Sequence, residues 1–176
     1  MARQSRRTEV EPLPEPARSS LFDTVALWLD ANDWTYTRNT EYQWFSSRYQ
    51  GDHGEWRLVF DTNESETMCR LLIYSVYPIR VPLLRRAAVA DFLARINFGM
   101  VIGDFVFDLS DGEVRMKTAA DVITGPFPDA QIDRLLRINL GAANQYLAPL
   151  LAVAFGDLSP EKAATLAEEK PDGPLQ

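Results

Sequence analysis

The sequence predicts an α+β domain in which an antiparallel sheet packs against helices. Between Leu83 and Thr118 the apolar pattern changes from helical spacing to strict alternation. Before this stretch, three strand candidates are joined by short polar segments, which favour an antiparallel meander over parallel crossovers. After Asp129 a second helical pattern continues to Phe155. Helices and strands therefore lie in separate runs, as in α+β folds.

The length of 176 residues suits one domain with a substantial core. Residues 1–19 carry Pro12, Pro14 and Pro16 and few apolar side chains, so we expect a disordered N-terminal lead. Residues 20–168 are predicted to form a single domain, and residues 169–176 a flexible tail.

Composition argues against several classes of protein. The formal net charge is −7, which disfavours binding to nucleic acid or to an anionic membrane. Cys69 is the only cysteine, so an intramolecular disulfide cannot form. The basic start lacks the apolar segment of a secretory signal, and no uninterrupted apolar run approaches the roughly 20 residues that span a bilayer. We therefore expect a bacterial-style cytoplasmic protein.

The N-terminal half begins with a helix that Ser20 caps and that ends near Ala31. Leu21, Val25 and Leu29 share one face of this helix. A short strand is expected at residues 34–38. The three strand candidates of the meander span residues 42–49, 55–61 and 68–77.

A helix and a hairpin make up the central region. Val89, Phe92 and Ile96 mark the buried face of the helix, and Gly99 is expected to close it in a left-handed conformation. A two-residue turn at Asp111 and Gly112 is expected to set the hairpin register. This register pairs Leu109 with Val114, Phe107 with Met116, Phe105 with Thr118, and Asp108 with Arg115.

Two more helices are expected at the C-terminal end. The first spans residues 129–155, and Pro149 should bend or split it because the proline ring clashes one turn back. Ser159 followed by Pro160 indicates the start of a short last helix.

Few residues suggest chemistry. His53 is the only histidine and is expected in an exposed loop, and Cys69 is expected to be a buried, inert thiol. Asp104 and Asp108 share the polar side of the hairpin, where a cation or an acid–base pair competes with an ordinary charge-balanced face. Four arginines near the central helix present the same choice between an anion site and a solvated surface: Arg80, Arg85, Arg86 and Arg95. We predict no catalytic residue, cofactor or metal site.

Asn139 falls on the apolar stripe of the long helix. A buried amide needs hydrogen-bond partners, so Asn139 either fixes the helix against a strand or faces a pocket.

Several motifs resemble those of the YbjN family of bacterial proteins. These are Asn97 after the central helix, the stretch Gly103-Asp104-Phe105-Val106-Phe107-Asp108, the Asp-Gly hairpin, and Tyr146, Leu147 and Leu150 on the long helix. The resemblance covers roughly residues 20–167. It implies a fold like that of type III secretion chaperones, with the order α-β-β-β-α-β-β-α, followed here by the short last helix.

The resemblance also implies a function. Family members are described as sensory transduction regulators with no established chemistry, so we expect a non-catalytic, chaperone-like or regulatory module that binds a protein or peptide client. A homodimer is compatible with it. The surface for a partner or ligand is predicted at Trp34, Tyr36, Trp44 and Asn139. The alternatives are a small carboxylate-dependent hydrolase around Asp104 and Asp108, or a regulator that senses a small ligand near Asn139.

Overall fold

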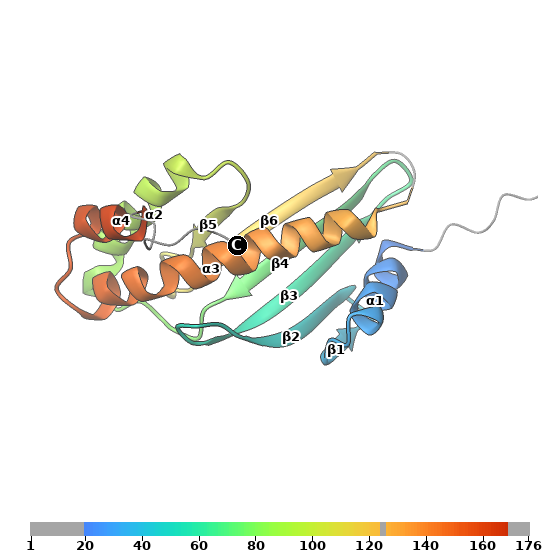
Figure 1. Ribbon diagram of the computed structural model, residues 1–176, viewed down its shortest axis with the longest axis horizontal. Coiled ribbons are helices and arrows are strands. Elements are labelled where there is room, and N and C mark those ends of the chain that lie inside the picture. Colours follow the sequence, from blue (N-terminus) through green and yellow to red (C-terminus); the bar gives the residue numbers. More distant parts are fainter. Residues whose placement is uncertain (1–19, 124–125, 169–176) are drawn as a thin grey trace, which may run out of the picture.

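The computed structural model describes residues 20–123 and 126–168. Six antiparallel strands form one sheet in the order β1-β2-β3-β4-β6-β5. The helices pack against one face of this sheet (Figure 1). The predicted α+β class and antiparallel sheet are confirmed. The expectations for residues 1–19 and 169–176 lie outside the described residues.

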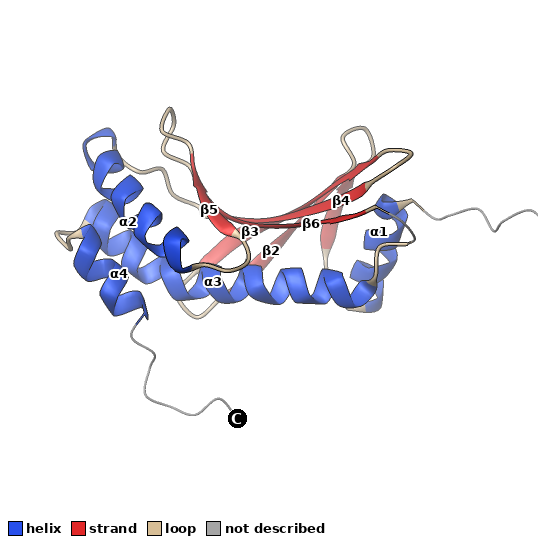
Figure 2. Ribbon diagram, turned by 90° about the horizontal axis from the view of Figure 1, so that it is seen from above, coloured by secondary structure: helices blue, strands red, loops and turns tan. Residues whose placement is uncertain are grey.

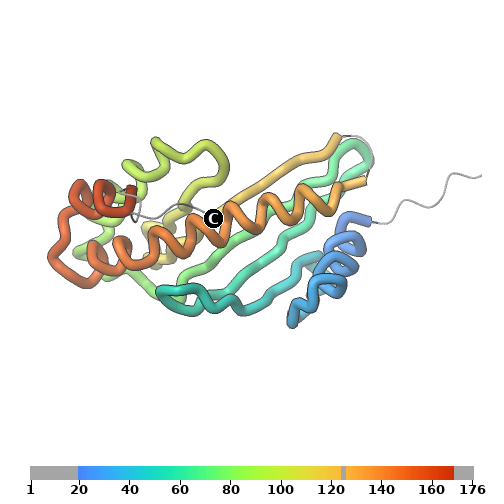
Figure 3. The backbone as a smooth tube through the Cα atoms, viewed as in Figure 1, coloured from blue at the N-terminus to red at the C-terminus, as the bar shows by residue number. Residues whose placement is uncertain are grey.

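The N-terminal half follows the predicted meander. Helix α1 spans Leu21–Ala31, and the Ser20 hydroxyl accepts a hydrogen bond from the Asp23 amide at 3.1 Å, which confirms the N-cap. The four strands that follow are β1 (Tyr36–Asn39), β2 (Trp44–Gln50), β3 (Glu55–Glu64) and β4 (Cys69–Val76). Figure 3 traces the backbone through these hairpins.

The central helix has the predicted buried face. A short 3₁₀ turn at Leu83–Arg85 leads into α2, Arg86–Gly99, where Val89, Phe92, Leu93 and Ile96 are buried. The expected left-handed conformation at Gly99 is wrong: Gly99 ends α2 without a positive φ, and Gly103, four residues later, has one. Asn97 then binds β5 (Asp104–Phe107) to the helix: its amide donates to the Phe105 carbonyl and accepts from the Phe105 amide.

The predicted register of the last hairpin is wrong by two residues. Strand β6 spans Val114–Val122, and Phe107 lies opposite Val114, while Phe105 lies opposite Met116. The same side chains still face the core, because a shift of two residues preserves the alternation. Arg115 faces Val106 instead of Asp108.

Local hydrogen bonds explain the longer β5–β6 loop. The Asp108 carboxylate accepts from the amide and the hydroxyl of Ser110, which forms an Asx turn in place of a strand pair. Gly112 has a φ of +82° and lies directly against the Val81 backbone, whose amide donates to the Gly112 carbonyl at 2.9 Å. These contacts favour the longer loop over the predicted two-residue turn.

The long helix is not split. Helix α3 runs from Asp129 to Phe155 with Pro149 inside it, and α4 follows at Pro160–Glu168. By length and composition alone α3 could cross a membrane. Its apolar stripe, however, packs in the hydrophobic core, with residues such as Ile132, Leu136 and Leu150.

The two faces of the sheet differ. Figure 2 shows the sheet close to edge-on, with α3 beneath it and α1, α2 and α4 toward its ends on the same side. The sheet bows toward α3, and the strand ends curve away from the helices. None of the described helices covers the other face, which is concave.

Candidate functional site

The uncovered concave face of the sheet, hereafter the open face, is the candidate site. Alternation along each strand places one set of side chains here while their neighbours enter the core. The open face includes Trp44, Ser46, Arg48, Glu55, Arg57, Val59, Asp61, Arg70, Leu72, Tyr74, Val76, Asp104, Val106, Arg115, Lys117, Ala119 and Asp121.

The strand register arranges these side chains in three rows across the sheet. The middle row contains Ser46, Val59, Tyr74 and Lys117. One flanking row, hereafter the arginine row, contains Arg48, Arg57, Val76 and Arg115. The other, hereafter the tryptophan row, contains Trp44, Asp61, Leu72 and Ala119.

Two adjoining hollows lie over the open face. One, of about 680 Å³, extends over β1, β2 and β3 and includes Ser46, Arg48 and Arg57 in its lining. The other, of about 300 Å³, is lined by Trp44, Val59, Tyr74 and Arg115 among others. Arg57 lines both hollows, which are together called the depression hereafter, and the smaller one has an aromatic and aliphatic floor.

Arg48 and Arg57 lie directly opposite each other on β2 and β3. Like charges at such a position repel, which disfavours the pairing of the two strands. Glu55 lies 3.4 Å from Arg48, but within residues 20–123 and 126–168 no ion pair involves Arg57. The arginine row is therefore a place where an external anion would relieve repulsion.

Asp61 carries the opposite charge on the other flank of the depression. It is half-buried between Trp44 and Leu72, and no ion pair to it forms among the described residues. Burial raises the pKa of its carboxyl group, because a low-dielectric surrounding disfavours the charged form. Burial, followed by the nearby Asp61, also raises the pKa of Tyr74.

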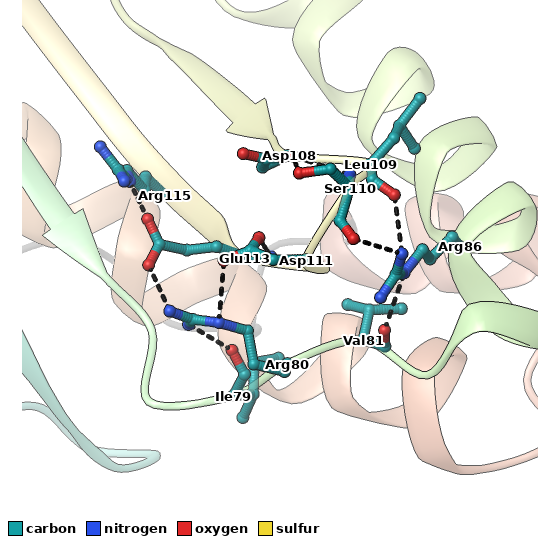
Figure 4. Close-up of polar contacts among 10 residues, drawn as sticks. All are labelled: Ile79, Arg80, Val81, Arg86, Asp108, Leu109, Ser110, Asp111, Glu113 and Arg115. Atoms are coloured by element: carbon teal, nitrogen blue, oxygen red, sulfur yellow. Dashed lines mark hydrogen bonds and ion pairs between the residues drawn. The ribbon is translucent and has the colours of Figure 1, made fainter.

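A buried carboxylate orients Arg115 at the edge of the open face (Figure 4). Glu113 accepts from Arg80 Nη2 at 2.7 Å and from Arg115 Nε, and the Arg80 Nε atom lies 3.3 Å from Asp111. The Arg115 guanidinium lies 5.8 Å from the Tyr74 ring centroid, within the range of a cation–π contact. The guanidinium of Arg115 is thereby held over the floor of the depression.

The four arginines near the central helix do not form one anion site. Arg86 donates to the carbonyls of Val81, Leu109 and Ser110, which fastens the β5–β6 loop to the start of α2 (Figure 4). Arg80 binds Asp111 and Glu113. Arg85 lies 3.9 Å from Asp157, and Arg95 forms an ion pair with Asp91.

The predicted aromatic surface residues lie on opposite faces of the sheet. Trp44 is on the open face. Trp34 packs against Tyr49 and Phe60 on the helix-covered side, with both ring-centroid distances 6.4 Å. Tyr36 packs on Phe45 at 5.4 Å, and its hydroxyl donates to Asp30.

Asn139 fixes α3 to the sheet. Its side chain has no exposed surface, and its amide nitrogen donates to the carbonyls of Ile73 and Met116 at 2.8 and 3.1 Å. Its oxygen accepts from the Ser75 hydroxyl at 2.5 Å, which in turn accepts from Trp56 Nε1. These bonds account for the amide by packing, the first of the two interpretations of the sequence.

The other candidates for chemistry remain apart. His53 is exposed in the β2–β3 loop, and Cys69 is buried with its thiol 3.4 Å from Glu64. Asp104 forms an ion pair with Lys117 at 3.2 Å, whereas Asp108 belongs to the β5–β6 loop. The hydrogen bonds from Ser110 hold the pKa of Asp108 below its usual range. No cluster of metal-ligating side chains occurs in the described part of the chain.

Sequence reasoning missed Arg57, Val59, Tyr74 and Glu113. Alternation was visible in residues 55–61, but it does not reveal which set of side chains the helices leave uncovered. The sequence carries no signal for the burial of Glu113, because its partner Arg80 comes from a distant segment. A search for like-charged residues in register, such as Arg48 and Arg57, could have indicated the open face.

Exposed apolar side chains also lie outside the open face, before α2 and at its C-terminal end. Leu84, Phe98 and Val101 are 94%, 95% and 95% exposed. The expected homodimer stays a prediction that light scattering would test.

Comparisons with known proteins identify the family of this chain. No curated protein matches the sequence. Among solved structures, the chain is similar to one described as "Crystal structure of YbjN, a putative transcription regulator from E. coli", with 13% sequence identity and a TM-score of 0.48. The match covers 68% of this chain and 83% of that one. Residues 21–152 match the model of the YbjN family, described as "Putative bacterial sensory transduction regulator". This chain therefore belongs to the YbjN family, as the sequence motifs indicated.

Proposed function

We propose that the protein is a non-catalytic regulator that binds a protein partner on its open face. One observation carries the proposal: the helices cover only one side of the sheet, and the other side presents a depression with Trp44, Val59 and Tyr74 on its floor. Concave surfaces with apolar floors and a few charged groups are typical of binding sites. The description of the family as a regulator is consistent with binding.

The two alternatives have less support. A carboxylate-dependent hydrolase would need Asp104 and Asp108 together in a cleft, but each is engaged elsewhere, by Lys117 and by Ser110. A ligand sensor at Asn139 would need an accessible amide, and this amide is fully buried. The cytoplasm stays our predicted location for the protein.

Affinity capture with two matched variants tests the proposal. Val59→Asp places a charge on the floor of the depression, and Leu27→Asp makes the same kind of change on α1, where Leu27 is 66% exposed. We expect a partner that wild type and Leu27→Asp retain and that Val59→Asp loses, with both variants folded by circular dichroism. Retention of every partner by Val59→Asp would contradict binding on the open face.

A further inference from the structure

The open face has a charge distribution unlike that of the whole chain. The formal net charge is −7, yet three arginines gather in one row of the open face. Arg57 has no ion pair among the described residues, and the Arg48 side chain is 85% exposed with only Glu55 at 3.4 Å. Arg115 is already paired with Glu113, so Arg48 and Arg57 are the residues that make the arginine row complementary to carboxylates, although the chain as a whole is acidic.

The shape of the depression limits what can occupy it. The sheet curves along its strands, so its concavity runs across them (Figure 2). The strand register places the arginine row on one side of the middle row and the tryptophan row on the other. Arg57 and Asp61 are four residues apart on β3, which separates the two rows by about 13 Å at roughly 3.3 Å per residue. An α-helix with its side chains is about 10–12 Å wide.

The spacing along the arginine row also fits a helix. Neighbouring strands lie about 4.8 Å apart, and one helical turn rises about 5.4 Å. A helix lying across the strands would therefore bring residues three or four positions apart over successive strands. Carboxylates with this spacing could meet Arg48 and Arg57 in turn.

We propose that the occupant of the open face is an amphipathic α-helix of a partner protein with acidic residues along one flank. This inference rests on the proposed function and adds the chemistry of the partner. The apolar stripe of the helix packs on Val59 and Tyr74, and its carboxylates face the arginine row. The other flank lies against Trp44 and Leu72 and carries a basic residue over Asp61.

Two other occupants fit less well. A second copy of the chain docked open face to open face would place one concave surface against another, which leaves the two floors out of contact. A nucleic acid would bring a continuous polyanion to a chain of net charge −7, which opposes its approach.

A displayed library of 18-residue helices tests the inference. The library keeps an apolar stripe of leucine and alanine and varies the flanks among Glu, Lys and Gln. With the full chain as bait, we expect selected helices to carry Glu on one flank. By fluorescence anisotropy, a Glu-flanked peptide should bind at least about tenfold more tightly than its Lys-flanked counterpart, as expected for charge-assisted hydrogen bonds.

Charge reversal locates the site. Arg57→Glu should abolish or invert the preference for Glu, whereas Arg95→Glu on α2 should retain it. Selection of Lys-flanked helices, no preference between flanks, or insensitivity to Arg57→Glu would overturn the inference. So would a single-stranded 20-nucleotide DNA that competes with the peptide and binds more tightly.

The outcomes separate the two proposals. If Val59→Asp loses a cellular partner while the library yields no acidic flank, the proposed function stands and the acidic helix is wrong. If acidic helices are selected but still bind Val59→Asp, both the inference and the open face as the binding site are wrong.

Discussion

Asp61 on the open face is half-buried, and its carboxylate forms no ion pair among the described residues. Burial raises its folded-state pKa above the value of about 3.9 for an unfolded chain. The proton is therefore bound more tightly in the folded protein. The resulting stabilisation is fully present below the unfolded pKa and is lost as the pH rises through the folded pKa.

Replacement of Asp61 by Asn removes the ionisable group and with it the loss of stability at neutral pH. We expect Asp61→Asn to be more stable than wild type at pH 7 by roughly 0.5 kcal/mol, the usual scale of a surface substitution. The difference should shrink as the pH falls below about 4, where Asp61 is neutral in both states. Urea unfolding at pH 7 and pH 3 measures both values. A less stable variant at pH 7 would mean that Asp61 has a favourable partner in the free protein.

Among the elements, the β5–β6 loop depends most on contacts with a distant segment. Gly112 has a φ of +82°, and a Cβ atom there would lie 2.5 Å from the Val81 carbonyl oxygen. Gly112→Ala should therefore destabilise the protein by more than about 1 kcal/mol. Gly141 lies inside α3 with nothing within 4 Å of its Cβ position, so Gly141→Ala should stabilise by roughly 0.5–1 kcal/mol. Thermal unfolding of both variants measures the two changes in stability. Equal changes in the two variants would contradict the prediction.

The same loop shows where prediction from the sequence ends. Periodicity predicted α1, the buried face of α2 and the meander, because these patterns depend on neighbours a few residues away. The hairpin register failed because Val81 and Arg86 stabilise a longer loop from outside the hairpin.

The candidate site was predictable only in part. Trp44 was expected on a binding surface and lies on the open face. Trp34 and Tyr36 looked equivalent in sequence, yet their rings pack on the helix-covered side, and of the two Tyr36 also lines the larger hollow. The face that a strand residue occupies depends on where the helices dock, and single-strand patterns do not contain that information.

At the scale of the whole molecule, the arrangement of the layers is the main functional feature. The described helices pack on one side of the sheet and form the core with it. There, the Asn139 side chain fastens α3 to the strands. The opposite side keeps half-buried Trp44, Val59 and Tyr74 together with the arginine row. The clamp of Glu113 by Arg80 and Arg115 orients one arginine of that row in advance of binding.

Site-specific photo-crosslinking tests most directly whether the open face binds a partner. A benzophenone side chain would replace Tyr74 on the open face or, as the control, Leu27 on α1. We expect light-dependent crosslinks to a discrete partner from position 74 and none from position 27. Crosslinks from position 27 with none from position 74 would contradict binding on the open face.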